Sequence, residues 1–134
     1  MAWRARKALL AAAISVNAGV TKTRSGGDFV SAGAVEENDS ICLTTTFARA
    51  AGSASLVKVD IEYSYDGGTS WAMLRTTLTD ELIQIATNTA VVTGTTVAVS
   101  KQLDVRGMSH LRVRSVENED GSNNITAFQV YMSY

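Results

Sequence analysis

The side chains that could act as nucleophiles or general bases are few, and they stand apart in the sequence. His110 is the only histidine, so a serine–histidine–aspartate triad would have to use it, yet no nucleophile motif lies beside it. Cys42 is the only cysteine, which excludes an intrachain disulfide. Because no histidine stands near Cys42, we expect it to be a small buried apolar residue rather than a reactive thiol. The sequence predicts no catalytic residue and no enzyme.

Ligands for a metal ion or a phosphate group are equally sparse. One histidine and one cysteine exclude the usual zinc sets, and neither GxxxxGK[ST] nor GxGxxG occurs. Oxygen ligands for calcium are present without the EF-hand order, in the side chains of Glu117, Asn118, Glu119, Asp120, Asn123 and Asn124. We favour a solvated hairpin loop for 117–124, and the same interpretation for Glu36, Glu37 and Asp39. No metal and no cofactor are expected.

A turn motif lies near the middle of the chain. Its pattern is S-x-D-x-G-x-[ST]-W, formed by Ser64, Asp66, Gly68, Ser70 and Trp71. These residues resemble the Asp box, a hairpin that recurs in the propeller blades of sialidases and in unrelated β-proteins. The resemblance implies a structural role, in which the aspartate caps the amides of the turn and the tryptophan packs beneath it. A propeller needs several four-stranded blades, so one copy does not predict a sialidase.

The strands on either side of this turn are predicted from the alternation of apolar and polar residues. Residues 56–73 read as two strands joined by a tight turn at Asp66-Gly67-Gly68, because glycine accepts positive φ and aspartate bonds to downstream amides. An alternating pattern with period two gives the first strand one buried and one solvated face. The predicted buried face holds Val57, Val59, Ile61 and Tyr63, and the solvated face holds Lys58, Asp60, Glu62 and Ser64.

Further short strands are predicted throughout the chain, over residues 28–30, 40–48, 80–85, 90–92, 95–100, 110–116 and 125–134. A connector at 21–27, a loop at 33–39 and a turn at 104–107 separate some of them. Alternation also predicts which side chains face inward. Arg112 and Arg114 are expected to face outward. The inward residues are Ile41, Leu43, Thr45 and Phe47, then Leu111 and Val113, and finally Phe128, Val130, Met132 and Tyr134. With 134 residues, the chain is predicted to form one antiparallel β-sandwich, either jelly-roll or Ig-like.

Charge is distributed unevenly along the chain. The net charge of −1 argues against a general nucleic-acid binder. Residues 1–27 contain five basic residues and no acid, whereas the other 107 residues carry a net charge of −6. We therefore divide the chain into an N-terminal arm, residues 1–20, which leads into the first strand, and a β-sandwich domain, residues 21–134.

The conformation of the arm has two alternatives, a short helix over residues 3–13 or a segment that becomes extended by about residue 12. Its apolar run at 8–14 is too short to cross a bilayer, and we expect it to be retained rather than removed as a signal peptide. A tryptophan beside basic residues is the composition of an interface anchor. We expect the arm to bind a partner through Trp3, Arg4, Arg6 and Lys7.

A wider pattern covers most of residues 8–134. It consists of a first strand of small residues, a Gly/Ser connector, the run at 41–47, the central hairpin, a Thr/Gly-rich middle, LRVR and a final alternating strand. This pattern resembles the small β-sandwich structural proteins of tailed bacteriophages, which are capsid cement or decoration proteins and neck or tail components. The resemblance implies a non-enzymatic protein of the virion that stabilises the particle. Its implied partners are viral capsid or tail proteins and further copies of itself, without nucleic acid or membrane.

A carbohydrate-binding β-sandwich module of a fibre or cell-surface protein is the alternative. Such a module would need a platform of exposed aromatic rings. Tyr63 and Tyr65 share one face of the central strand, and Tyr131 faces away from Phe128 and Met132. Core packing is the expected position of Tyr63, which weakens this platform.

Overall fold

The computed structural model describes residues 7–24, 29, 32–49, 57–74, 84–85 and 96–134. Every regular element in these ranges is a β-strand, as expected for a chain rich in alternating β-branched residues. The strands are β1 Lys7–Val16, β2 Thr21–Thr23, β3 Gly33–Ala34, β4 Ser40–Arg49, β5 Val57–Ser64, β6 Ala72–Met73, β7 Gln84–Ile85, β8 Thr96–Asp104, β9 His110–Asn118 and β10 Ile125–Ser133.

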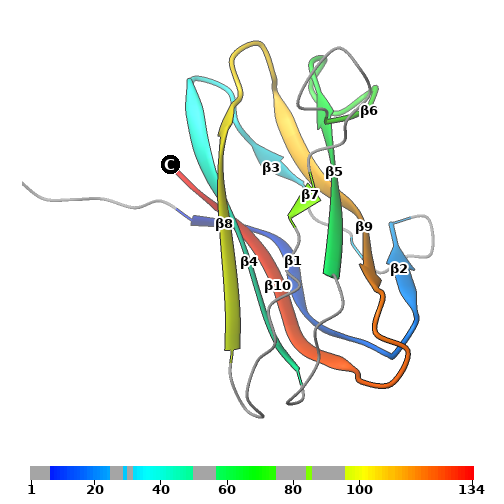
Figure 1. The fold of residues 1–134 in the computed structure, drawn as a ribbon. Helices are drawn as coiled ribbons and strands as arrows, with labels where there is room; N and C mark the ends of the chain where they lie inside the picture. The colour runs from blue at the N-terminus through cyan, green and yellow to red at the C-terminus, as the bar shows by residue number, and fades with distance from the viewer. Residues whose placement is uncertain (1–6, 25–28, 30–31, 50–56, 75–83, 86–95) are drawn as a thin grey trace, which may run out of the picture.

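Two antiparallel sheets form the two layers of the molecule (Figure 1). The first sheet has four strands in the order β1-β10-β4-β8. The second has the order β2-β9-β5-β6, with β3 also paired to β9 and β7 also paired to β5. The predicted antiparallel β-sandwich is therefore confirmed, and β9 and β5 form the centre of the second sheet.

The core lies between the two sheets and uses the faces that alternation assigned. Val57, Val59 and Ile61 of β5 are buried, as are Leu111 and Val113 of β9. From the first sheet come Ile41, Leu43, Thr45 and Phe47 of β4, and Phe128, Val130 and Met132 of β10. Burial of these side chains supplies the main driving force for folding, at about 25 cal/mol per Å² of apolar surface removed from water.

A β-bulge interrupts the pairing of β5 with β9. Asp60 lies opposite Ser115 and the next residue, Ile61, lies opposite Val113, so Arg114 is the extra residue of β9. The bulge leaves Arg114 exposed and Ser115 half-buried, while Val116 returns to the core. The sheet thus presents Arg112, Arg114 and Ser115 together on its outer side, which the simple alternation of the sequence does not predict.

Two segments that we expected to be irregular contain short strands. The connector predicted at 21–27 begins with β2, which pairs with residues 115–117 of β9. The loop predicted at 33–39 begins with β3, which pairs with Leu111 and His110 of the same strand. Strands of two or three residues are too short to show a period, so the sequence missed β2 and β3. Residues 35–39 contain no strand, as predicted.

Other boundaries also differ from expectation. β8 continues to Asp104 because it pairs with β4 over its whole length, and β9 continues to Asn118. Tyr134 follows the last strand and is 36% exposed instead of facing inward. The predicted strands at 90–92 and most of 28–30 and 80–85 fall outside the described residues. In 28–30, Phe29 is described; it is not in a strand and packs against Phe128 at a centroid distance of 6.5 Å.

The N-terminal segment is extended where it is described. β1 pairs with β10 from Lys7 opposite Ser133 to Val16 opposite Ile125. This part of the segment is therefore a strand and not the helix that one alternative placed at 3–13. Residues 1–6 lie outside the described residues, and the division of the chain at residue 20 stays a prediction.

Candidate functional site

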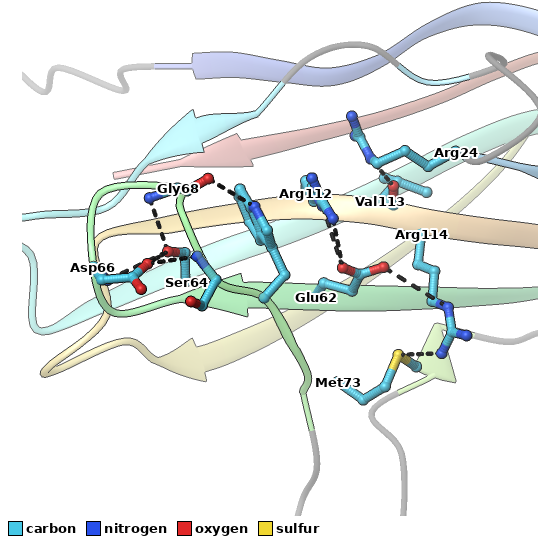
Figure 2. A network of polar contacts seen from close by, with 11 residues as sticks. Arg24, Glu62, Ser64, Asp66, Gly68, Met73, Arg112, Val113 and Arg114 are labelled. Atoms are coloured by element: carbon cyan, nitrogen blue, oxygen red, sulfur yellow. Dashed lines mark hydrogen bonds and ion pairs between the residues drawn. The ribbon is translucent and has the colours of Figure 1, made fainter.

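The turn between β5 and β6 is fixed by the side chains of Ser64 and Asp66 (Figure 2). The Asp66 Oδ1 accepts hydrogen bonds from the amides of Ser70, at 2.8 Å, and Thr69, at 3.1 Å. Hydrogen bonds from the Ser70 amide, from the Ser64 hydroxyl and from Ser70's side chain lower the pKa of Asp66, since they favour its charged form. The loop is seven residues long between the paired strands, longer than the tight turn that we expected.

Ser64 was assigned to the solvated face, and this assignment was wrong. Its side chain is 0% exposed, because its hydroxyl is turned into the loop. The Ser64 Oγ accepts a hydrogen bond from the amide of Gly68 at 2.8 Å and donates one to Asp66 Oδ1 at 2.8 Å. A polar group can be buried at little cost when it is satisfied in this way.

A second serine fastens the turn to β9. The Ser109 Oγ accepts a hydrogen bond from the amide of Gly67 at 2.9 Å and donates one to the carbonyl of Ser64 at 3.1 Å. Sequence reasoning missed Ser109, because it lies 45 residues from Ser64 and belongs to no local motif. Gly67 and Gly68 both have positive φ, at 78° and 95°, as the turn chemistry predicted.

Trp71 packs over this turn and not in the core. Its indole Nε1–H donates to the carbonyl of Gly68 at 3.0 Å, and the side chain is half-buried. The guanidinium of Arg112 lies over its ring, 3.9 Å from the ring centroid. This is the geometry of a cation–π contact, in which the negative face of the ring attracts the cation. The turn therefore holds a tryptophan that positions an arginine of β9.

Glu62 stands between two arginines on the outer face of the second sheet (Figure 2). Its Oε2 accepts from the Nη2 of Arg112 at 2.9 Å and from the Nε of Arg112 at 3.2 Å. Its Oε1 lies 3.7 Å from the Nε of Arg114. Arg114 also donates from Nη1 to the sulfur of Met73 at 2.8 Å. One carboxylate thus faces two guanidinium groups.

A depression of about 540 Å³ lies beside this network. We call it the arginine groove; it is lined by Thr21, Thr23, Arg24, Asp60, Glu62, Arg112, Arg114 and Ser115. A smaller hollow of about 290 Å³ shares Glu62 and Arg114 with it and reaches Trp71. Arg24 donates from Nε to the carbonyl of Val113 at 2.8 Å. Burial and the charge of Arg112 lower the pKa of Arg24, and Glu62 partly offsets this.

The residues that we considered for catalysis or metal binding are not brought together. His110 is half-buried at the start of β9, and its Nδ1 is buried without a hydrogen-bond partner. Cys42 is half-buried on β4 and not fully buried as predicted, with its Sγ 4.0 Å from the hydroxyl of Thr44. Among the described residues, no three His, Cys, Asp or Glu side chains are grouped so that they could hold a metal ion.

The segment 117–124 is less solvated than we expected. Asn118 and Asp120 are buried, at 1% and 8% exposure. Asn118 donates from Nδ2 to the carbonyls of Asn123, at 2.9 Å, and Val16, at 3.3 Å. The Asp120 Oδ1 accepts from the amides of Ser122 and Asn123. These polar groups organise the β9–β10 connection and tie it to the end of β1.

The structure describes only part of the predicted partner-binding arm. Trp3, Arg4 and Arg6 lie outside the described residues, and Lys7 is the first residue of β1. The structure does bring Trp71 of the turn motif together with Arg112 and Glu62, a combination that the sequence did not suggest. In the part of the chain with described coordinates, no helix has the length and apolar character needed to cross a membrane.

Comparison with known proteins gives a likeness in fold. No protein-family profile matches the chain, and no curated protein sequence is similar to it. Among solved structures, a chain of infectious bursal disease virus Gt strain is similar with a TM-score of 0.52 and 12% identity. A chain of the VP2 subviral particle of the same virus, and one of its Gx strain, each have a TM-score of 0.50 and 11% identity.

These matches cover 97% of this chain and 32% of the viral chains. The chain therefore spans about a third of the length of the proteins that it resembles. At this level of identity the likeness shows a shared β-sandwich fold, in agreement with the two antiparallel sheets of the structure.

Proposed function

We propose that the chain is a non-enzymatic structural protein of a bacteriophage virion, and that it binds neighbouring capsid or tail proteins and stabilises the particle as a cement or decoration protein. The observation that carries this proposal is the likeness in fold to chains of a virus and of a subviral particle. This likeness extends over 97% of the chain. The sequence pattern of small phage sandwich proteins supports it independently. Further copies of the same chain are included among the proposed partners.

The N-terminal arm is the first contact that we assign to this role. Trp3, Arg4 and Arg6 precede Lys7, the first residue of β1. We expect the sandwich to fold without these three residues. A tryptophan ring buries a large apolar area at a small entropic cost, and arginine pairs with carboxylates on a partner. The contribution of the charges is screened by salt over a Debye length of about 8 Å, whereas the contribution of the ring is not.

The proposal is tested by mass spectrometry of virus particles purified from the cells that produce this chain. The chain should be present in a fixed ratio to the other particle proteins. Its absence from washed particles would remove the proposal.

A second experiment tests the arm. A chain lacking residues 1–6 should keep its melting temperature but enter particles poorly. Replacing Arg4 and Arg6 with glutamine should reduce incorporation, and the matched lysine variants should restore it. Normal incorporation of the truncated chain would show that residues 1–6 of the arm are not a contact.

A sugar-binding function is a second candidate, favoured by the exposure of Tyr65. Tyr65 is 64% exposed and is the first residue of the β5–β6 turn. Tyr63, in contrast, packs against the core, so the two rings do not form a platform. A glycan array on which neither the wild type nor a Tyr65→Ala variant exceeds background would remove this candidate.

A further inference from the structure

We propose that the arginine groove on the outer face of the second sheet binds an acidic segment of another protein. The inference deepens the proposed function, since it names a second contact surface and the chemistry of its partner. It rests on the proposed function only in assigning that partner to the particle. The binding chemistry itself follows from the groove.

The first argument is the charge of the groove. Its lining holds three arginines, Arg24, Arg112 and Arg114, but two carboxylates, Asp60 and Glu62. Glu62 is shared between Arg112 and Arg114. The Nε of Arg24 donates to the backbone carbonyl of Val113. The groove therefore carries an excess of positive charge that a carboxylate from outside would balance.

The second argument is that one guanidinium is already held in place. Arg112 is fixed from one side by the ring of Trp71 at 3.9 Å and from the other by Glu62 at 2.9 Å. Trp71 is in turn fixed by its bond to Gly68 in the capped turn. A side chain that is ordered before binding loses little entropy when the ligand arrives. This gives the Ser64–Asp66 turn a role in recognition as well as in folding.

Arg114 is the arginine within reach of a ligand. Its side chain is 55% exposed, against 13% for Glu62, and it stands at the bulge of β9. Its Nε lies 3.7 Å from Glu62 Oε1, which is beyond hydrogen-bond length, and its Nη1 donates to the sulfur of Met73, a weak acceptor. A better-placed carboxylate can therefore compete for it. Arginine pairs with carboxylates in a planar fork with two parallel hydrogen bonds, which lysine does not provide.

The volume of the groove suits a short peptide segment. Its volume of about 540 Å³ lies within the roughly 300–1,000 Å³ of ordinary ligand sites. In an extended peptide, every second side chain points to the same side, at intervals of about 6.5 Å. Thr21 and Ser115 also line the groove, and the Ser115 hydroxyl donates to Asp60 Oδ2 at 3.3 Å. A nucleic acid fits less well, because Asp60 and Glu62 would repel a continuous row of phosphates.

The test uses the purified full-length chain and two labelled probes, a short peptide in which glutamate alternates with glycine and its glutamine counterpart. Fluorescence anisotropy at low salt should show saturable binding of the glutamate peptide, about tenfold or more tighter than the glutamine peptide. Arg114→Gln should weaken this binding about tenfold, which corresponds to about 1.4 kcal/mol. Added salt should weaken it further.

The matched control is Arg106→Gln. Arg106 is also an exposed arginine paired with a carboxylate, Asp104, but it does not line the groove. This variant should bind the glutamate peptide as the wild type does. Both variants change exposed side chains, and Arg106→Gln also removes the pair with Asp104. A single cooperative melting transition for each variant should show that it remains folded.

Three results would overturn the inference. They are equal binding of the glutamate and glutamine peptides, an equal loss in Arg106→Gln and Arg114→Gln, and tighter binding of a single-stranded oligonucleotide than of the glutamate peptide. Because no particle is present in this assay, its failure is separate from a failure of the proposed function, which is decided by the composition of purified particles.

Discussion

Replacing Ser64 with alanine is expected to destabilise the whole domain through one hydroxyl group. The Ser64 Oγ takes part in three hydrogen bonds, with the amide of Gly68 at 2.8 Å, the amide of Asp66 at 3.3 Å and the carboxylate of Asp66 at 2.8 Å. The position is completely buried, so water cannot replace the lost oxygen. The turn would keep its backbone path only with an amide left unsatisfied.

The expected magnitude follows from these contacts. Leaving a buried donor unsatisfied costs about 1–3 kcal/mol, and losing a hydrogen bond to a charged group costs about 1.5–3 kcal/mol. Because the turn can relax in part, we expect Ser64→Ala to lower the free energy of unfolding by about 2–4 kcal/mol. At roughly 4 °C per kcal/mol for a chain of this size, the melting temperature should fall by roughly 8–16 °C.

The assay is urea unfolding followed by circular dichroism, with Thr69→Ala as the matched control. Thr69 lies in the same turn and contributes its backbone amide, which alanine retains, while its side chain is exposed. The control should therefore stay within about 0.5 kcal/mol of the wild type. If Ser64→Ala is as stable as Thr69→Ala, our account of the turn is wrong.

Three further predictions concern stability. Trp71→Ala should cost about 1–2 kcal/mol in urea unfolding, less than the roughly 3–5 kcal/mol of a buried tryptophan, because the half-buried ring mainly supports Arg112; a larger cost would place the ring in the core. Hydrogen bonds from the side chain and the amide of Arg106 lower the pKa of Asp104 to about 2 from 3.8, so its contribution to stability is present above about pH 4 and is lost as the pH falls towards 2; Asp66 acts in the same direction. Melting temperatures measured across this pH range should depend less on pH for an Asp104→Asn variant than for the wild type. An identical pH dependence would contradict the role given to Asp104. Asn118→Ala should cost about 2–3 kcal/mol, measured by urea unfolding, because it leaves buried backbone groups unpaired; wild-type stability would show that water replaces the amide.

Much of the fold could be predicted from the sequence. In a long strand with one buried face, apolar side chains recur at every second residue, and this pattern is visible in the sequence. The alternation of apolar and polar residues predicted the inward faces of β4, β5 and β9, and the structure buries them except for Tyr63 of β5, which is half-buried. The same reasoning failed at Ser64, where the hydroxyl is buried because it bonds the turn. It also failed for β2 and β3, whose few residues give no periodic signal.

The candidate site was much harder to predict, because its parts come from distant segments. Arg24, Glu62 and Arg112 meet only after β2, β5 and β9 pair side by side. The outward positions of Arg112 and Arg114 were predicted. The bulge that adds Ser115 to the same face could not be predicted from the alternation of apolar and polar residues. The partner-binding role of the arm was inferred from composition, and it stays a prediction.

The central claim is that this chain is a component of a virus particle, and electron cryomicroscopy of purified particles tests it most directly. The account predicts density for a two-sheet sandwich at repeated positions on the capsid or tail, in contact with neighbouring proteins. Particles that are complete and stable, with no such density and no copy of the chain, would contradict it.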